Sequence, residues 1–151
     1  MRGASVQRQM PVGSAEVFAL LHDYDRRLEW DTLLKEARLT RGCSRAERGA
    51  TSLCVGKPLF GLVGMETRYV SFEPGVVAAV KLVNRPPFFH DFAASIRHQD
   101  NPGGSTATYQ FRFAAKPRPL RWLLEPIMLA MLKRETATRL EALSRFLGAA
   151  T

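Results

Sequence analysis

The sequence places one histidine where it could do chemistry. His90 stands between Phe88 and Phe92 in a run of alternating apolar residues. Since successive side chains of a strand point to opposite faces, we expect His90 to share an apolar face with both rings. An imidazole on that face could donate a proton to a bound molecule or hydrogen-bond its carbonyl oxygen. The commoner role is a core histidine satisfied by a backbone carbonyl, and Asp91, which faces the other way, is not expected to orient the ring.

A pair of opposite charges lies on an earlier candidate strand, over residues 62–73. Glu66 and Arg68 are two residues apart and therefore share one face. If that face is the inner one, they form an ion pair in a cavity wall, able to anchor a carboxylate or polarise a carbonyl. If the other face is inner, the charges lie in water, which is the commoner fate of charges. The cavity is then lined by Met65, Thr67 and Tyr69, and the pattern leaves this choice open.

A tyrosine completes the candidate catalytic set. Tyr109, Phe111 and Phe113 alternate with polar residues, so we expect the phenol on the inner face. A buried hydroxyl needs a hydrogen-bond partner, which is either a ligand or another protein group. If the protein is an enzyme, His90, Arg68 and Tyr109 are the candidates for general acid/base work.

Other chemistry has no support in the sequence. There is no CxxC, HExxH, GxSxG, Walker or GxGxxG motif. His90 and His98 are eight residues apart, about 26 Å along an extended strand, so they do not share a metal. Cys43 and Cys54 lack the spacing of a disulfide framework or a zinc site. We therefore expect no metal and no cofactor, in a reducing, cytoplasmic setting.

Composition bounds the class of protein. With 151 residues, 46% of them hydrophobic, the chain is expected to form a single domain over residues 1–151. No apolar run reaches the ~18 residues of a membrane span, and the first residues do not resemble a signal peptide. The net charge of +8 comes from scattered residues, which favours solubility over nucleic-acid binding. Peripheral contact with a membrane surface stays open, as does the choice between monomer and homodimer.

The elements that must position these residues follow from periodicity and turn signals. A strand over residues 5–10 leads to two short helices, the first capped by Ser14. Short connections between the later strands predict an antiparallel meander. The predicted strands cover residues 34–41, 49–57, 62–73, 76–84, 88–99 and 106–115.

A long C-terminal helix is the partner that such a sheet needs. We expect it to begin with Pro126 in its first turn and to cross the concave face of the sheet. Its apolar stripe is Leu129, Leu132, Thr136, Leu140, Leu143 and Leu147. The small polar Thr136 interrupts the stripe, so a cavity is predicted between Leu132, Thr136 and Leu140 of the helix and Phe92, Tyr109 and Phe111 of the sheet. Just before the expected helix there is a group of apolar residues, which forms either an exposed apolar surface or part of the core: Leu120, Trp122, Leu123 and Leu124.

This order of elements resembles the START-like, or SRPBCC, superfamily with its α+β helix-grip fold. The resemblance covers nearly the whole chain and is carried by several stretches in order: PVGSAEVFALLHDYDRRLEWDTLL, ETRYVSFEPG, NPGGSTATYQFRF and LLEPIMLAMLKRE. Within the superfamily, the sequence is most similar to the polyketide cyclase/dehydrase and lipid-transport group. The resemblance implies an apolar ligand held between a curved sheet of about seven strands and the long helix.

Three functions remain open, because fold alone does not choose among them. The first is binding of a lipid-like or polyketide-like small molecule. Its expected ligand contacts are Glu66, Arg68, His90, Phe92, Tyr109, Phe111, Leu132, Thr136 and Leu140. The second is an aromatase/cyclase or dehydrase of the same fold. The third is an interaction protein of the quinone-chaperone type that uses its basic C-terminal half against a membrane or RNA.

Overall fold

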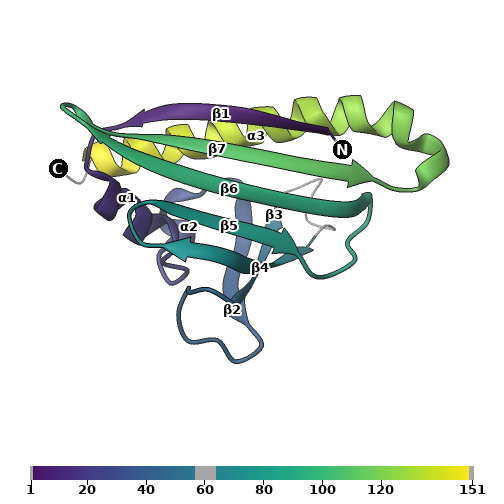
Figure 1. The fold of residues 1–151 in the computed structure, drawn as a ribbon, viewed down its shortest axis with the longest axis horizontal. Helices are drawn as coiled ribbons and strands as arrows, with labels where there is room; N and C mark the ends of the chain where they lie inside the picture. The colour runs from purple at the N-terminus through teal and green to yellow at the C-terminus, as the bar shows by residue number, and fades with distance from the viewer. Residues whose placement is uncertain (1, 57–63, 150–151) are drawn as a thin grey trace.

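The chain folds into one antiparallel sheet with a long helix packed along it (Figure 1). The computed structural model describes residues 2–56 and 64–149. The elements are β1 (Arg2–Met10), α1 (Ser14–Leu21), α2 (Arg27–Trp30), β2 (Leu34–Thr40), β3 (Thr51–Gly56), β4 (Gly64–Glu73), β5 (Val77–Leu82), β6 (Phe89–Asn101), β7 (Gly104–Ala115), the 3-10 helix η2 (Arg118–Leu120) and α3 (Arg121–Ala149). Among these helices, none is long and apolar enough to cross a membrane.

The sheet is the predicted meander with its first strand added at the far edge. Its strand order is β1-β7-β6-β5-β4-β3-β2, and every pair is antiparallel. All six strands expected after residue 33 are present, with ends that differ by up to a few residues. The predicted strand residues 57, 62 and 63 lie outside the described residues.

The apolar stripe of α3 fixes the helix against the sheet. Leu140, Leu143 and Leu147 are buried in one cluster with α1 residues such as Phe18. The hydroxyl of Ser144 adds a hydrogen bond to the carbonyl oxygen of Gln9 in β1, at 3.3 Å. Nearer the start of α3, a second cluster contains rings of β6 and β7 and the helix residues Met128, Leu129 and Leu132. The predicted stripe is therefore confirmed, and it spans both clusters.

The predicted start of α3 is wrong. The helix begins at Arg121, so Pro126 lies inside it rather than in its first turn. Proline lacks the amide of one helical hydrogen bond, but contacts with the end of β7 hold the early turns. The buried carboxylate of Glu125 accepts a hydrogen bond from the Ala115 amide at 3.0 Å, and Arg121 Nε donates to the Ala115 carbonyl at 2.9 Å. These tertiary bonds explain why the helix begins five residues earlier than expected.

The predicted cap of α1 is also wrong. Ser14 is the first residue of the helix and Gly13 is the N-cap. Glycine has no side chain, so the first turn has no side-chain cap from this position. Instead the Ser14 amide donates to Oδ1 of Asp100 at 2.7 Å. The carboxylate that satisfies the helix start thus comes from the end of β6, far along the chain.

A bulge at the start of β6 overturns the expectation for His90. The register pairs Phe89 with Ala115 and then Asp91 with Ala114, which leaves His90 as the extra residue. One inserted residue reverses which side chains face inward. Phe89 is therefore buried, whereas His90 and Phe88 are exposed. From Phe92 onward the predicted inner face is correct.

Candidate binding cavity

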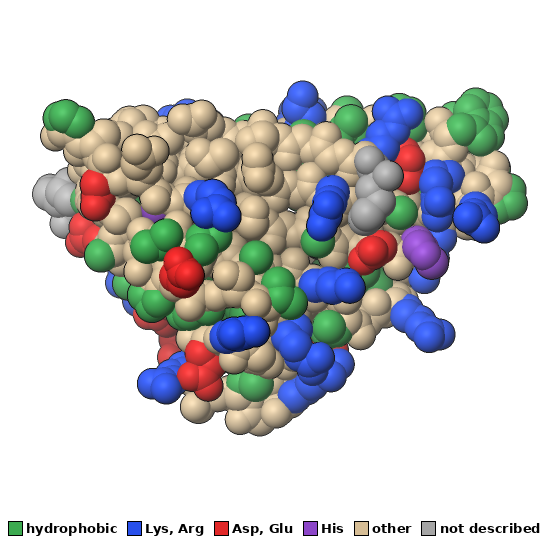
Figure 2. Space-filling view, viewed as in Figure 1, with side chains coloured by type: hydrophobic (Ala, Val, Ile, Leu, Met, Phe, Trp, Pro, Cys, Tyr) green, Lys and Arg blue, Asp and Glu red, His purple; other side chains and the backbone are tan. Residues whose placement is uncertain are grey.

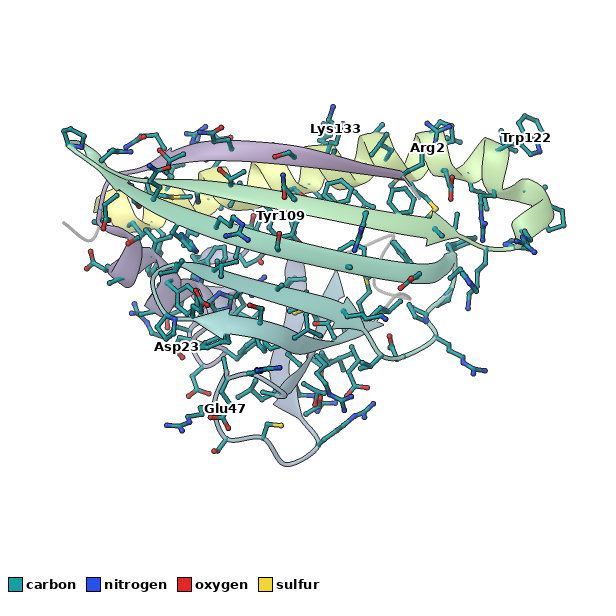
Figure 3. The ribbon with its side chains drawn as sticks, in the orientation of Figure 1. Arg2, Asp23, Glu47, Tyr109, Trp122 and Lys133 are labelled. Carbon is teal, nitrogen blue, oxygen red and sulfur yellow. The ribbon has the colours of Figure 1, made fainter. Side chains whose placement is uncertain are left out.

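A cavity of about 200 Å³ lies between α3 and the sheet. Its wall comes from the α1–α2 segment, from strands β2 to β7 and from α3. Tyr109 contributes from the middle of β7 (Figure 3), and Leu132 and Thr136 contribute from the helix. The predicted position of the cavity, opposite the gap that Thr136 leaves in the stripe, is confirmed.

One end of the cavity carries a chain of hydrogen bonds. The Tyr69 hydroxyl lies 2.7 Å from Nδ1 of His22 and 2.7 Å from the Tyr24 hydroxyl. Tyr24 in turn donates to Oγ of Ser52 at 3.0 Å. Because each tyrosine has one proton, Tyr69 must then donate to Tyr24, and His22 must donate from Nδ1 to Tyr69. This arrangement puts the free lone pair of the imidazole on Nε2, which has no hydrogen-bond partner within the described residues.

Burial keeps these groups uncharged. Burial, with smaller contributions from the positive charge of Arg27 and from the nearby His98, lowers the pKa of His22 to about 3. Burial also raises the pKa of Tyr24, and raises that of Tyr69 well above its usual range. At neutral pH the chain of hydrogen bonds therefore joins a neutral imidazole and two neutral phenols. Such groups form directed hydrogen bonds with a ligand but are weak acids and bases.

Two arginines share one buried carboxylate beside this chain. Nε of Arg27 lies 3.0 Å from Oδ2 of Asp31, and Nε of Arg139 lies 2.9 Å from the same oxygen. Asp31 is only 1% exposed, and both arginines line the cavity. The Arg139 contact is close, but its N–H is not directed at the oxygen, so Nε forms no hydrogen bond to any described residue. The two guanidinium groups share one carboxylate, so each has further N–H donors that can face the cavity.

Glu135 is the other ionisable residue of this wall. It lies on α3 next to Thr136 and lines the cavity. Burial raises its pKa, the Arg139 charge lowers it, and Asp31 raises it. The direction of this shift disfavours the charged form of the Glu135 carboxyl in the buried wall. We call this end of the cavity the polar end: His22, Tyr24, Arg27, Asp31, Ser52, Tyr69, Glu135 and Arg139.

The other end of the cavity is apolar and aromatic. Phe89 and Phe92 meet edge to face with ring centroids 6.0 Å apart. Phe92 also stacks on Phe111, at 6.5 Å and an interplanar angle of 16°. We call this the aromatic end, and its lining residues are Met65, Phe89, Phe92, Tyr109 and Leu132. Flat rings and a flexible thioether suit a planar apolar guest.

The residues predicted from sequence divide into two groups. Four of them line the cavity, namely Phe92, Tyr109, Leu132 and Thr136. Their contact with a ligand stays a prediction. Phe111 and Leu140 are buried behind the wall, in the second and the first apolar cluster, respectively, and do not line the cavity.

The charged candidates are not in the cavity wall. His90 is exposed on the bulge of β6. Of the two alternatives left open for β4, the structure has Met65, Thr67 and Tyr69 on the inner face, so Glu66 and Arg68, named among the expected ligand contacts, do not line the cavity. Glu66 forms its ion pair with Arg41 rather than with Arg68, and Nε of Arg41 lies 3.2 Å from Oε2 of Glu66.

Sequence reasoning missed most of the polar end. His22 and Tyr24 come from the link between the two short helices, and Arg27 begins the second of them; this segment had no periodic signal for facing a cavity. One signal was available there, because the polar run HDYDRR lies between the buried residues Leu21 and Trp30. On α3, Arg139 is three residues after Thr136, hence on nearly the same helix face.

Comparison with known proteins gives the wider setting of this fold. The sequence profile of a family described as polyketide cyclase/dehydrase and lipid transport matches residues 1–147. No curated protein matches the chain in sequence.

Several solved structures share the architecture. TTHA0849 from Thermus thermophilus has 11% identity and a TM-score of 0.83, with 99% of each chain covered. The Zhui aromatase/cyclase from Streptomyces sp. R1128 has 14% identity and a TM-score of 0.77, over 99% of this chain and 93% of that one. The di-domain ARO/CYC StfQ of the steffimycin biosynthetic pathway has 11% identity and a TM-score of 0.80, over 98% of this chain and 51% of that one. These likenesses confirm the predicted helix-grip fold; at such identities they show the fold alone.

Proposed function

The chain belongs to the polyketide cyclase/dehydrase and lipid transport family, and from this premise we propose that it binds an apolar, ring-bearing small molecule between α3 and the sheet. The observation that carries the proposal is the division of one cavity into a polar and an aromatic end. Ligand sites are concave and mostly apolar, with a few convergent polar groups that fix orientation. A cavity of about 150 Å³ already admits benzene, so the 200 Å³ found here suits a guest of one or two rings.

The polar end suggests what the guest carries. Arg27 and Arg139 present N–H donors, and the Nε–H of Arg139 has no acceptor among the described residues. Guanidinium groups form their strongest hydrogen bonds with carboxylate and other oxygen acceptors. The ligand class is therefore an aromatic or polycyclic molecule with a carbonyl, phenolate or carboxylate group at one end.

A substitution in the helix stripe tests whether the cavity is used. Thr136→Trp fills the space beside Leu132 and should abolish uptake of 2-naphthoate, measured by titration calorimetry. The matched control is Ala137→Trp, which adds the same side chain at an exposed position of the same turn. Unchanged binding in Thr136→Trp would contradict the proposal. So would destabilisation by ~1–3 kcal/mol without binding in the wild type, the effect of overpacking a filled core.

A second function, cyclisation or dehydration of a polyketide, is favoured by the hydrogen bonds that join His22, Tyr69 and Tyr24. In this arrangement the free lone pair on Nε2 of His22 can accept a hydrogen bond from an enol hydroxyl and hold it in a fixed orientation. Of the catalytic candidates proposed from sequence, only Tyr109 lines the cavity. Loss of water from a bound polyketide analogue, detected by mass spectrometry and abolished in Tyr69→Phe, would support this function. Release of the analogue unchanged would leave binding as the function.

A further inference from the structure

The first half of α3 is apolar on the side that faces away from the sheet. Trp122, Leu123, Pro126, Ile127 and Ala130 are all exposed. At about 100° per residue they fall within an arc of about 140°. Trp122 is 74% exposed and Ile127 is 54% exposed. We call this surface the outer apolar face.

This half of the helix is therefore apolar on both sides. Its inner residues Met128, Leu129 and Leu132 pack against the aromatic rings of β6 and β7. A helix that is hydrophobic all round is normally buried all round. The second half of α3 follows the normal rule, since exposed positions there include Thr138 and Arg145. Exposed apolar residues on α3 are thus concentrated in the helical turns that form the outer apolar face.

Two further apolar side chains lie at the same end of the molecule. Leu120, in η2 just before α3, is 45% exposed. Phe88 is 52% exposed and has a φ of 70°, a strained conformation for a bulky residue. Its carbonyl accepts a hydrogen bond from the Lys116 amide at 3.0 Å, which fixes it beside the chain that enters η2. Figure 2 shows hydrophobic side chains at this end of the molecule, standing among Lys and Arg side chains.

The charge around this surface is almost entirely positive. Between residues 116 and 134 the only acidic residue is Glu125, which is buried and bonded to the Ala115 amide. The basic residues of the same stretch are Lys116, Arg118, Arg121, Lys133 and Arg134. Lys133 and Arg134 follow the outer apolar face along the same side of the helix, and Arg118 precedes it. Figure 3 shows Trp122 at the far end of α3, directed away from the sheet.

We propose that the outer apolar face docks this protein on an anionic lipid bilayer. Trp122, Leu123 and Ile127 enter the interface between headgroups and acyl chains, where tryptophan is favoured. The flanking cations meet lipid phosphates, each contributing through the negative surface potential. A protein partner of opposite charge fits less well, because a single apolar arc with cations at both ends matches a continuous apolar layer bounded by anions. The helix lies parallel to the membrane, as interfacial helices with one apolar outer side do.

The chain carries its own reporter for this test. It has two tryptophans, of which Trp30 is 2% exposed and Trp122 is 74% exposed. A blue shift of emission on adding vesicles therefore reports insertion of Trp122. The probes are vesicles of phosphatidylcholine alone and of phosphatidylcholine with phosphatidylglycerol. We expect the shift, and co-sedimentation of the protein, with the anionic vesicles, and at least a tenfold weaker affinity for the neutral ones.

Two substitutions separate the apolar from the charged contribution. Trp122→Ser should weaken binding to anionic vesicles by roughly tenfold or more, through loss of buried apolar area. Arg118→Glu should weaken it about tenfold at low salt and much less at high salt, since screening removes the charge contribution. The controls are Leu28→Ser, at a residue of α2 that is 50% exposed, and Arg48→Glu, at an exposed residue before β3. Both should bind vesicles as the wild type does, and circular dichroism checks that all four variants fold.

Three results would overturn the proposal. The first is no emission shift and no co-sedimentation with anionic vesicles. The second is equal weakening by the substitutions and by their controls. The third is a blue shift that appears with rising protein concentration in the absence of lipid, together with a dimer in analytical ultracentrifugation, which would assign this face to a second copy of the chain. None of these measurements requires a ligand in the cavity, so the docking and binding proposals fail independently.

Discussion

The two ends of the cavity are built by opposite means. The polar end depends on hydrogen bonds and on two arginines around the buried Asp31. The aromatic end depends on ring contacts such as those of Phe89 and Phe92, with few polar groups. Polar networks in a low-dielectric setting require every partner, whereas apolar packing tolerates changes that conserve volume. The polar end should therefore be sensitive to single changes and set orientation, and the aromatic end should be tolerant and supply affinity.

The largest expected effect is at the centre of the polar end. Asp31→Asn removes the carboxylate charge that Nε of Arg27 and Nε of Arg139 share. Removing one partner of a buried ion pair costs about 3–5 kcal/mol of the free energy of unfolding. Urea denaturation measures the loss. The control is Asp25→Asn at an exposed site, and a loss below about 1 kcal/mol in Asp31→Asn would show that the carboxylate does not hold the two arginines.

The second-largest expected effect is a loss of stability at low pH, caused by the buried histidines at and near the polar end. Burial lowers the pKa of His22 to about 3 and also lowers that of His98. The unfolded chain, with a histidine pKa near 6.5, binds protons first as pH falls, so stability is lost below about pH 6.5 and down to about pH 3 for His22. His22 contributes a slope of up to about 1.4 kcal/mol per pH unit, which amounts to about 1.6 kcal/mol between pH 6.5 and 5.

Urea midpoints at pH 7.5, 6 and 5 check this dependence. The groups that face His22 are Tyr69, His98 and the cation of Arg27, and none of them supplies a negative charge to hold a proton on the imidazole. His22→Gln should reduce the slope while keeping a polar group at the site. A wild-type stability that stays flat from pH 7.5 to 5 would contradict a neutral, buried imidazole.

A smaller effect is expected from either tyrosine of the hydrogen-bond chain. The Tyr69 hydroxyl has two partners in the chain, so Tyr69→Phe leaves both His22 and Tyr24 short of a bond. The expected loss is about 1–3 kcal/mol. Tyr24→Phe removes the terminal bond to Ser52 as well as the one to Tyr69, but leaves the His22 bond intact. Each substitution thus removes two bonds, and a loss below about 0.5 kcal/mol in both variants on thermal denaturation would show that the chain does not stabilise the fold.

The smallest expected effect tests the aromatic end. Met65→Leu conserves the volume of a flexible side chain in the wall, and such exchanges usually cost less than about 1.5 kcal/mol. We expect little change in the melting temperature and in the affinity for 2-naphthoate. A loss as large as that in Asp31→Asn would show that both ends are equally constrained.

Much of the fold is encoded in local periodicity and was predictable. The α3 stripe and the inner face from Phe92 onward follow from spacing alone, because burial of one side enforces the pattern. The β6 bulge was not predictable, because one extra residue leaves no mark in the alternation and moves His90 outward. The inner face of β4 was equally hidden, since both of its faces mix polar and apolar residues.

The polar end was hidden for a different reason. Its residues come from segments far apart in sequence that only tertiary packing brings together. The pairing of Arg139 on α3 with Asp31 after α2 has no local signal in either segment. A pair at a spacing of four, Arg27 and Asp31, was visible in the sequence, but such pairs usually lie on the surface. The cavity wall was therefore predicted where it is apolar and missed where it is charged.

The most direct measurement compares two ligands that differ only at one end. Titration calorimetry at pH 7.5 with 2-naphthoate and 2-methylnaphthalene keeps the rings and removes the carboxylate. The wild type should bind 2-naphthoate at least tenfold more tightly, because a hydrogen bond to a charged group contributes about 1.5–3 kcal/mol. Arg139→Gln should remove that preference and leave 2-methylnaphthalene binding unchanged. Equal affinity for both ligands in the wild type, or a preference that survives in Arg139→Gln, would contradict the assignment of the polar end.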